Sequence, residues 1–440
     1  MVQTNHIKQI MKRLKEILQW SIWRNQCVLF SLWILMVIIS VGLHMHKFNN
    51  FLIYKFTFWH AVDGKSIFEN YGDHGDVNHY GPIFSFIIAP FALASGKETS
   101  LDSISLWLGV FLWHLTLALF LWWAIRQSTL TAEQKVGIIW LTAHEMLNAL
   151  GMSQFNVATA AMILLSYSAI RRGKDSWAVF WIMLGILVKI YGVVGLVFFL
   201  FSKNKSRFVM WLFVWTIVLV VLPMPFFGTD YVIGQYIEWG KCLSEKAQEN
   251  QLSDFQNISL LGMVRKIGYA ISAGLPAYYE VFESAGKNPD VTNWWWSTWN
   301  DLWLIIPALI YSALPWLRVK QYKHHAFQLM CLALVLMFIN IFSTGAENSS
   351  YIISMLGVAI WFIAVPWKRS WFDWCLLIFC FVITSLSSTD LFPGNIRTYW
   401  IRAFALKAFP VVLIWLKLVL EMCTRDYDEQ SQCELLVISK

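Results

Sequence analysis

Charge is the scarcest property of this chain. Only 14% of its 440 residues are charged, against about 25% in a typical soluble domain, whereas 58% are hydrophobic. So few charges cannot cover a water-facing surface of this size, which excludes a soluble globular protein and leaves a polytopic membrane protein. The formal charge of +7 needs no nucleic-acid partner, because cytoplasmic loops of membrane proteins are enriched in Lys and Arg.

Motifs for soluble catalysis and for metal binding are also missing. The seven cysteines form no C-x-x-C pair and lie mostly beside apolar runs, so we interpret them as small hydrophobic residues. The chain has no G-x-x-x-x-G-K-S/T loop, no H-E-x-x-H and no G-x-S-x-G. A lipid-carried donor is therefore expected rather than a cytosolic nucleotide. No cofactor or metal site is predicted, and a requirement for a divalent metal is left open.

Basic clusters beside the apolar runs predict the topology. Residues 27–45 are uncharged and long enough to span a hydrocarbon core of about 30 Å, and the basic residues before them place the N-terminus in the cytoplasm. We expect an all-α helical bundle with about ten to twelve membrane segments. The other expected segments are 81–95 (short or re-entrant), 106–125, 136–150, 157–170, 177–201, 208–227, 302–317, 327–342, 351–367, 371–386 and 403–422.

The same pattern predicts the domain organisation. Residues 1–26 form a cytoplasmic N-terminal segment, 27–422 a single integral membrane domain, and 423–440 a cytoplasmic tail. The hydrophilic stretches 46–80, 228–300 and 343–350 are expected on the non-cytoplasmic side.

Lys189 interrupts an apolar stretch that lies between two basic clusters. A single helix over 177–201 would place one cluster outside, whereas a broken pair that turns at Lys189-Ile190-Tyr191-Gly192 keeps both inside. We favour the broken pair, with the single span as the alternative. A lysine within a membrane segment costs about 3 kcal/mol on insertion scales and is a functional hypothesis by default. Its expected partner is a lipid phosphate, with the Tyr191 hydroxyl beside it, and the alternative is a structural ion pair.

The first outer loop gathers titratable groups behind a helix expected over 51–62 at the membrane surface. The candidate general bases are Asp76, Asp73, Glu69 and Asp63. Asp76 leads, because it directly precedes the return to the membrane at residues 78–82. His79 and Tyr80 are candidates for substrate binding. The alternative interpretation is a solvated loop without a catalytic role.

Amides, hydroxyls and one carboxylate mark other short turns near the membrane surface. Such groups suit the recognition of sugar hydroxyls. The candidates are Gln154, Asn156, Asn257, Ser259 and Glu347. His144-Glu145, inside 136–150, is a second intramembrane polar pair. It is either functional or a structural partner of a neighbouring helix.

Several short motifs occur in a fixed order over about residues 28–420. They are Asn49-Asn50-Phe51-Leu52-Ile53-Tyr54-Lys55, His79-Tyr80-Gly81-Pro82-Ile83-Phe84, Ser153-Gln154-Phe155-Asn156, Leu187-Val188-Lys189-Ile190-Tyr191-Gly192, Asn257-Ile258-Ser259-Leu260-Leu261-Gly262 and Ala346-Glu347-Asn348-Ser349-Ser350-Tyr351-Ile352-Ile353. This order resembles glycosyltransferase family 87, a group with the GT-C fold. The stretch Thr389-Asp390-Leu391-Phe392-Pro393 resembles the versions in Bacteroidetes-type bacteria.

The resemblance implies transfer of a sugar, often mannose or arabinofuranose, from a polyprenyl-phosphate donor to a lipid or glycan acceptor. The reaction would take place among membrane lipids, on the outer (periplasmic) face of the inner cell membrane. The family's acidic first-loop position falls on Asn50, which cannot accept a proton. Another loop carboxylate therefore has the role, or this member is catalytically altered.

The competing function is a polytopic transporter or flippase. Lys189 and His144-Glu145 would then be substrate or coupling residues. The long outer loops and the absence of repeat symmetry disfavour it.

Overall fold

The computed structural model describes residues 21–43, 49–72, 76–100, 102–250, 255–283 and 298–428. Every regular element in these ranges is a helix, which confirms the predicted all-α helical bundle. Asp73, one of the candidate bases, lies outside the described residues.

The N-terminal half runs through the helices η1 (Ser21–Arg24), α2 (Gln26–Leu43), α3 (Asn49–Val62), α4 (Ile83–Ser95), α5 (Ile104–Gln127), α6 (Ala132–Gly151), α7 (Asn156–Arg171), α8 (Asp175–Val188), η2 (Ile190–Phe201), α9 (Lys205–Val221), α10 (Met224–Phe227) and α11 (Thr229–Glu249). The C-terminal half runs through α12 (Leu260–Ala273), α13 (Leu275–Glu283), α14 (Thr298–Ala313), η4 (Leu314–Leu317), η5 (Val319–Lys323), α15 (His325–Ile341), η6 (Asn348–Ser350), α16 (Tyr351–Ile363), α17 (Trp371–Cys380), η7 (Phe381–Ser385), η8 (Leu386–Ser388), α18 (Gly394–Ile396), η9 (Arg397–Arg402) and α19 (Ala408–Thr424).

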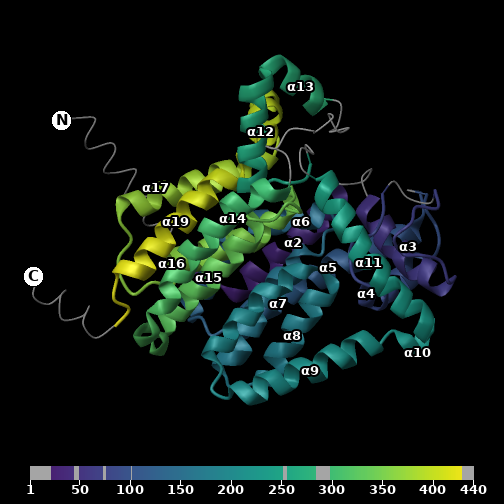
Figure 1. Cartoon of the computed structure of the whole chain (residues 1–440), viewed down its shortest axis with the longest axis horizontal. Helices are drawn as coiled ribbons and strands as arrows, with labels where there is room; N and C mark the ends of the chain where they lie inside the picture. Colours follow the sequence, from purple (N-terminus) through teal and green to yellow (C-terminus); the bar gives the residue numbers. More distant parts are fainter. Residues whose placement is uncertain are drawn as a thin grey trace, which may run out of the picture.

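Helix α16 is enclosed by other helices. It packs against α15 and α6, while α19 and α7 lie beside them (Figure 1). Every residue of α16 from Tyr351 to Phe362 is buried. A helix that is apolar on all sides is stable only when other helices or lipid surround it, and here helices do. The short segment 343–350 therefore leads directly into a fully enclosed helix.

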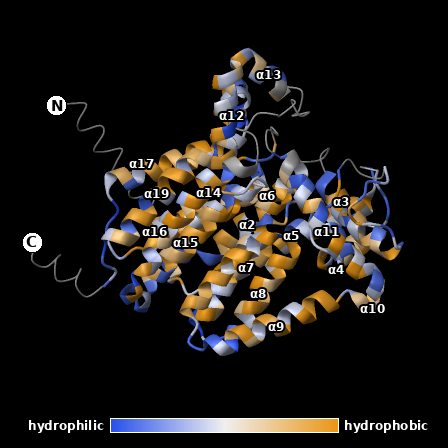
Figure 2. Ribbon diagram, viewed as in Figure 1, coloured by the Kyte–Doolittle hydropathy of each residue, from blue (hydrophilic) through white to orange (hydrophobic). Residues whose placement is uncertain are grey.

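The outside of the bundle is also apolar. Figure 2 shows hydrophobic residues on the outward faces of α8 and α9, and the side chains of Phe213 and Ile217 on α9 are 66% and 63% exposed. In the described residues, three segments are long and apolar enough to cross a membrane: 104–127, 205–227 and 371–388. Seven shorter apolar helices accompany them within the same described ranges. A protein that is surrounded by lipid needs an apolar outer surface as well as an apolar interior.

The predicted break at Lys189 is confirmed. Helix α8 ends at Val188, and the 3₁₀ helix η2 folds back along it from Ile190. Gly185 and Gly192 face each other across this hairpin so closely that a Cβ on Gly192 would lie 2.5 Å from the Gly185 carbonyl carbon. Two glycines at the contact let the two backbones approach each other just beneath the turn.

Three expected segments differ from the structure in detail. The stretch 208–227 is confirmed as part of the membrane-length segment 205–227, but Pro223 divides it into α9 and α10, because proline cannot donate an amide hydrogen to continue α9. The expected span 403–422 begins as a helix only at Ala408, after a turn in which Ala405 has a φ of +52°. The helix predicted over 51–62 is present as α3, which begins two residues earlier, at Asn49, and packs against α4.

Candidate active site

The carboxylate of Glu347 lies at the centre of a polar cluster at one end of α16. Its Oε2 accepts hydrogen bonds from Gln154 Nε2 at 2.9 Å and from Ser349 Oγ at 3.3 Å. Its Oε1 accepts one from Gln256 Nε2 at 3.1 Å. The backbone amide of Ser350 also donates to the Glu347 side chain, so four groups of the protein hold this carboxylate.

Gln154 reaches this cluster because the turn between α6 and α7 is strongly anchored. Ser153 adopts a φ of +52°, and its carbonyl oxygen accepts a hydrogen bond from Trp113 Nε1 at 2.8 Å. The Ser153 hydroxyl also lies 2.9 Å from His114 Nε2. The amide oxygen of Gln154 then accepts hydrogen bonds from the hydroxyls of Tyr54 and Tyr80, at 2.9 and 2.8 Å. The first outer loop is thereby joined to Glu347 through a single glutamine.

Lys189 lies beside this cluster, at the tip of the α8–η2 hairpin. Its ammonium donates to Asn156 Oδ1 at 2.8 Å and lies 4.7 Å from the ring centroid of Tyr191 and 5.7 Å from that of Tyr80. Within the described residues this is its only hydrogen bond, and no carboxylate forms an ion pair with it. An ammonium has three donors, so two remain for a ligand.

Hydroxyls complete the surroundings of Lys189. The Tyr191 hydroxyl lies 2.8 Å from Ser343 Oγ, and Asn156 Nδ2 donates to Ser349 Oγ at 3.1 Å. The sequence-predicted residues Tyr80, Gln154, Asn156, Lys189, Tyr191 and Glu347 thus meet in one place, although they come from separate segments of the chain.

Asn257 and Ser259 lie next to this site, but their side chains are hydrogen-bonded to each other. Ser259 Oγ donates to Asn257 Oδ1 at 2.7 Å and caps α12 by accepting from the Gly262 amide at 3.1 Å. The intervening Ile258 amide donates to Ala346 O at 2.8 Å. The two residues shape the turn that brings Gln256 to Glu347. Gln256 was not predicted from the sequence, because an amide in a long hydrophilic stretch gives no distinguishing signal.

Within the described part of the chain, the hydrogen bonds of the remaining loop candidates go to residues other than Glu347. Asn50, at the start of α3, donates from Nδ2 to Met152 O at 2.8 Å, so it supports the α6–α7 turn. Asp76 is exposed, and its carboxylate accepts the amide of Val77 at 2.8 Å. Glu69 is exposed and accepts the hydroxyl of Tyr71 at 3.0 Å.

His79 lines a polar cavity between this loop and α11. The cavity has a volume of about 270 Å³, and Phe68, Glu69, Glu238 and Lys241 are among its other lining residues. The Nδ1 of His79 lies 3.1 Å from Cys242 Sγ, while its Nε2 has no hydrogen-bond partner among the described residues. Burial lowers the pKa of His79 to about 4, and the charge of Lys246 acts in the same direction.

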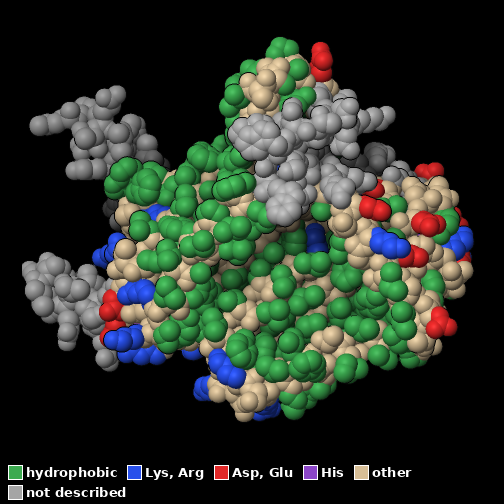
Figure 3. Space-filling model, viewed as in Figure 1, with side chains coloured by type: hydrophobic (Ala, Val, Ile, Leu, Met, Phe, Trp, Pro, Cys, Tyr) green, Lys and Arg blue, Asp and Glu red, His purple; other side chains and the backbone are tan. Residues whose placement is uncertain are grey.

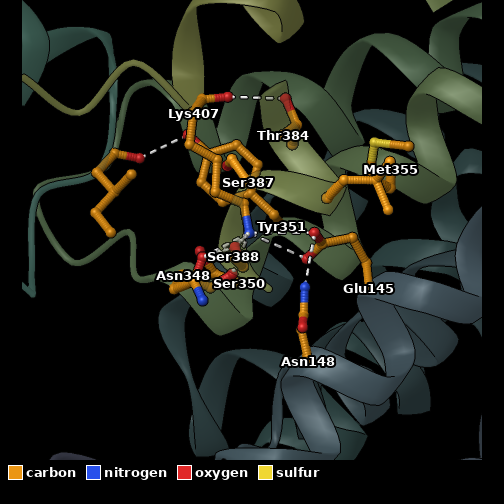
Figure 4. Close-up of polar contacts among 12 residues, drawn as sticks. Glu145, Asn148, Asn348, Ser350, Tyr351, Met355, Thr384, Ser387, Ser388 and Lys407 are labelled. Atoms are coloured by element: carbon orange, nitrogen blue, oxygen red, sulfur yellow. Dashed lines mark hydrogen bonds and ion pairs between the residues drawn. The ribbon is translucent and has the colours of Figure 1, made fainter. Parts of the chain in front are cut away.

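His144 and Glu145, the second polar pair predicted in a membrane segment, have different surroundings. Glu145 is fully buried and forms an ion pair with Lys407, with an N–O distance of 3.1 Å (Figure 4). Nδ1 of His144 has no hydrogen-bond partner among the described residues. The partner of Glu145 is 262 positions away along the chain, so sequence spacing alone could not identify it.

The geometry defines a class: an all-helical membrane protein in which a lysine with one hydrogen-bond acceptor, Lys189, lies among amides, hydroxyls and a carboxylate. The sequence model of glycosyltransferase family 87 matches residues 78–341, which is 264 of the 440 residues. The chain therefore belongs to glycosyltransferase family 87, and it is a membrane glycosyltransferase. No curated protein matches the chain significantly. The family match includes Gln154, Asn156 and Lys189 and ends before Glu347.

Proposed function

We propose that this glycosyltransferase transfers a hexose or pentose, mannose-like in its hydroxyl pattern, from a polyprenyl-phosphate donor to a lipid or glycan acceptor. One observation carries the proposal. Lys189 is a half-buried lysine whose ammonium has a single neutral acceptor, Asn156, beside the hydrogen-bonding groups around Glu347.

The donor phosphate binds at Lys189 in this proposal. A phosphate oxygen is a strong acceptor for the unused donors of the ammonium. The Tyr191 hydroxyl, 2.8 Å from Ser343 Oγ, offers a further donor beside it. The polyprenyl chain would extend into the bilayer next to the α8–η2 hairpin, because an isoprenoid tail is as apolar as the exposed residues of that region.

The sugar would lie between Lys189 and Glu347. Gln154, Asn156 and the Glu347 carboxylate are side chains of the kind that orient sugar hydroxyls, and they are already fixed by their own hydrogen bonds. Fixed groups lose little entropy when substrate binds. The acceptor would enter from the cavity beside His79, where Glu238 and Lys241 offer both an acceptor and a donor for hydroxyl groups.

The reaction exchanges one C–O bond for another. The acceptor hydroxyl gives its proton to a loop carboxylate, for which Asp76 is our leading candidate, and its oxygen attacks the anomeric carbon. The bond from that carbon to the phosphate oxygen breaks. The electron pair leaves with the polyprenyl phosphate, and the Lys189 ammonium stabilises the added charge. Glu69 and Glu347 are the alternative bases.

The charge distribution supports a location in the inner cell membrane with the site on the non-cytoplasmic side. Most Lys and Arg side chains on this face lie along the lower and left edges of the molecule, whereas most acidic side chains lie at the right, over α3 and α11, together with a few basic ones (Figure 3). Basic ends face the cytoplasm in bacterial membrane proteins. If the chain crosses the membrane several times in this orientation, the Glu347 cluster lies near the outer surface of the membrane.

Transfer of labelled sugar from a polyprenyl-phosphate donor, by purified protein in lipid nanodiscs, tests the proposal. Lys189→Met should raise the KM for donor or abolish transfer, since it removes the charge and keeps the length of the chain. Lys55→Met is the matched control. Lys55 is also a buried lysine, but its ammonium donates to Glu98 O and lies outside the Glu347 cluster. Normal donor binding by Lys189→Met would refute the phosphate assignment.

The same preparation, reconstituted in sealed liposomes, separates transfer from transport. Movement of the donor lipid across the bilayer without formation of a glycosylated product would favour a flippase. Product formation without net lipid movement supports the transferase.

A further inference from the structure

The segment that carries Glu347 is held from two sides. The Glu347 carboxylate faces Gln154 and Gln256. The next residue, Asn348, is bound from the other side by Lys407, whose Nζ donates to Asn348 Oδ1 at 2.6 Å and to Asn348 O at 3.0 Å. Two consecutive residues of one short turn, Glu347 and Asn348, are therefore held by partners on opposite sides of that turn.

The ammonium of Lys407 has acceptors for all three of its N–H donors. In addition to Asn348, it contacts both carboxylate oxygens of Glu145, at 3.1 and 3.3 Å, and Ser388 Oγ, at 3.2 Å. Figure 4 shows the ammonium between the Glu145 carboxylate and Asn348. The side chains of Lys407 and Glu145 are only 3% and 0% exposed, so neither is available to substrate. This is the opposite of Lys189, which has one acceptor.

Irregular backbone brings Lys407 to this position. The π-helix η9 and the turn at Ala405 precede it, and the π-helix η7 supplies Thr384, whose hydroxyl donates to Lys407 O at 2.9 Å. π-Helical turns interrupt ordinary helices and often accompany functional sites. Ser388, just after η7, also donates to Asn348 Oδ1, at 2.8 Å.

A buried ion pair is weak evidence for stability, because desolvation offsets much of the attraction. What the pair does provide here is a fixed geometry, since its five close contacts join α6, the 343–350 segment and the C-terminal turn. The structure assigns Glu145 and Lys407 a positioning role: the pair fixes Asn348 and thereby aims the Glu347 carboxylate at the substrate. This inference rests on the proposed function, in which Glu347 contacts the sugar or acceptor.

The kinetic test uses Lys407→Gln and the double variant Glu145→Gln/Lys407→Gln in nanodiscs. The double variant leaves no unpaired buried charge, so it should recover much of the thermal stability that the single variant loses. Its kcat should stay about 10²-fold below wild type, since misplacement of a catalytic group by about 1 Å costs that much, while the KM for donor changes little. A double variant with wild-type kcat would overturn the inference.

The Arg369–Glu421 ion pair supplies a matched control. It is similarly buried, with 5% and 6% exposed side chains 3.1 Å apart, and it lies near the opposite end of α16. Glu421→Gln should lower the melting temperature and leave kcat unchanged. If it lowers kcat as Lys407→Gln does, the effect of Lys407 is general destabilisation and not positioning.

A readout without catalysis keeps this inference separate from the proposed function. Hydrogen–deuterium exchange of the amides at 345–350 should be faster in Lys407→Gln and unchanged in Glu421→Gln. Unchanged exchange in Lys407→Gln overturns the positioning role, even if wild-type protein is active. Faster exchange in a protein that transfers no sugar would support the positioning of the segment and refute only the proposed function.

Discussion

At the scale of single residues, the number of hydrogen-bond acceptors around a buried lysine distinguishes a structural role from a ligand-binding role. Lys407 has a carboxylate and three further acceptors, whereas Lys189 has one amide oxygen. A charge with unused donors in an apolar surrounding is costly unless a ligand supplies the missing contacts. Lys189 is therefore the residue at which we expect an anionic group to bind.

The base is tested by replacing its carboxylate with an amide of the same size. Asp76→Asn should lower kcat by about 10²–10⁴-fold, the usual contribution of general base catalysis. Expression should be normal, because Asp76 is exposed and holds only the neighbouring Val77 amide. The measurement is the initial rate of sugar transfer at saturating donor.

Asp102→Asn, in an exposed turn before α5, is the control and should retain full activity. Full activity of Asp76→Asn together with inactive Glu347→Gln would move the role of base to Glu347.

The buried histidine of the outer loop predicts a dependence of stability on pH. The pKa of His79 is about 4 in the folded protein, below its ordinary value of 6.5, because the ring is buried. The unfolded chain then takes up the proton first, so stability is lost as the pH falls from about 6.5 to about 4, by at most about 3 kcal/mol. Melting temperatures in detergent across this range measure the effect.

His79→Gln should flatten that pH dependence, since glutamine does not titrate. The charged groups that act on the pKa of the ring are Lys246, Asp76 and Lys189, and they are the same in both proteins. Identical pH profiles for the variant and the wild type would show that His79 is not the titrating group.

The site residues divide into those with a sequence signal and those without. Lys189, Gln154 and Asn156 could be predicted, because polar groups beside long apolar runs stand out. Gln256 and Lys407 could not. The first lies in a hydrophilic stretch, and the second acquires its role only from partners such as Glu145, far away along the chain.

At the scale of elements, the α8–η2 hairpin places Lys189, and two glycines allow it to close. In Gly192→Ala the new methyl group would lie 2.5 Å from backbone atoms of Gly185 and Ile186, so the two arms must separate. We expect a loss of about 1–3 kcal/mol in stability, as for other overpacked contacts, and a raised KM for donor. Thermal unfolding and donor titration measure the two effects.

Gly234→Ala is the matched control, because a Cβ at this position of α11 meets no atom within 4 Å. It should leave both quantities near wild type. Equal melting temperatures and equal KM values for the two variants would contradict a close-packed hairpin.

The hairpin also illustrates what charge patterns can predict. Two basic clusters on either side of 177–201 favoured a broken pair over a single span, and the sequence from Lys189 to Gly192 indicated the turn, where α8 does end. They could not predict that the second arm is a 3₁₀ helix, or that the expected span 403–422 opens with a turn. Those details depend on packing between helices, which hydropathy does not encode.

At the scale of the whole molecule, the charge distribution predicts orientation. A cysteine introduced at Glu245 should react with a membrane-impermeant maleimide added to intact spheroplasts, whereas one at Lys203 should react only after the membrane is opened. Glu245 lies on α11 within the expected outer loop, and Lys203 belongs to a basic cluster.

The labelling uses a background in which the native cysteines are serine, because Cys27 and Cys375 are exposed. Labelling of the Lys203 position from outside would show that the orientation is reversed.

The polar cluster draws on residues spread along most of the chain, and this has a consequence for biosynthesis. Gln154 and Glu347 are 193 positions apart, and Glu145 and Lys407 are 262 apart. A growing polypeptide leaves the ribosome from its N-terminus, and its early segments enter the bilayer first. A nascent chain that has not yet reached Lys407 already contains Lys189 and Glu347, but not the contact that fixes Asn348. Truncated products are therefore expected to insert into the membrane without consuming the donor lipid.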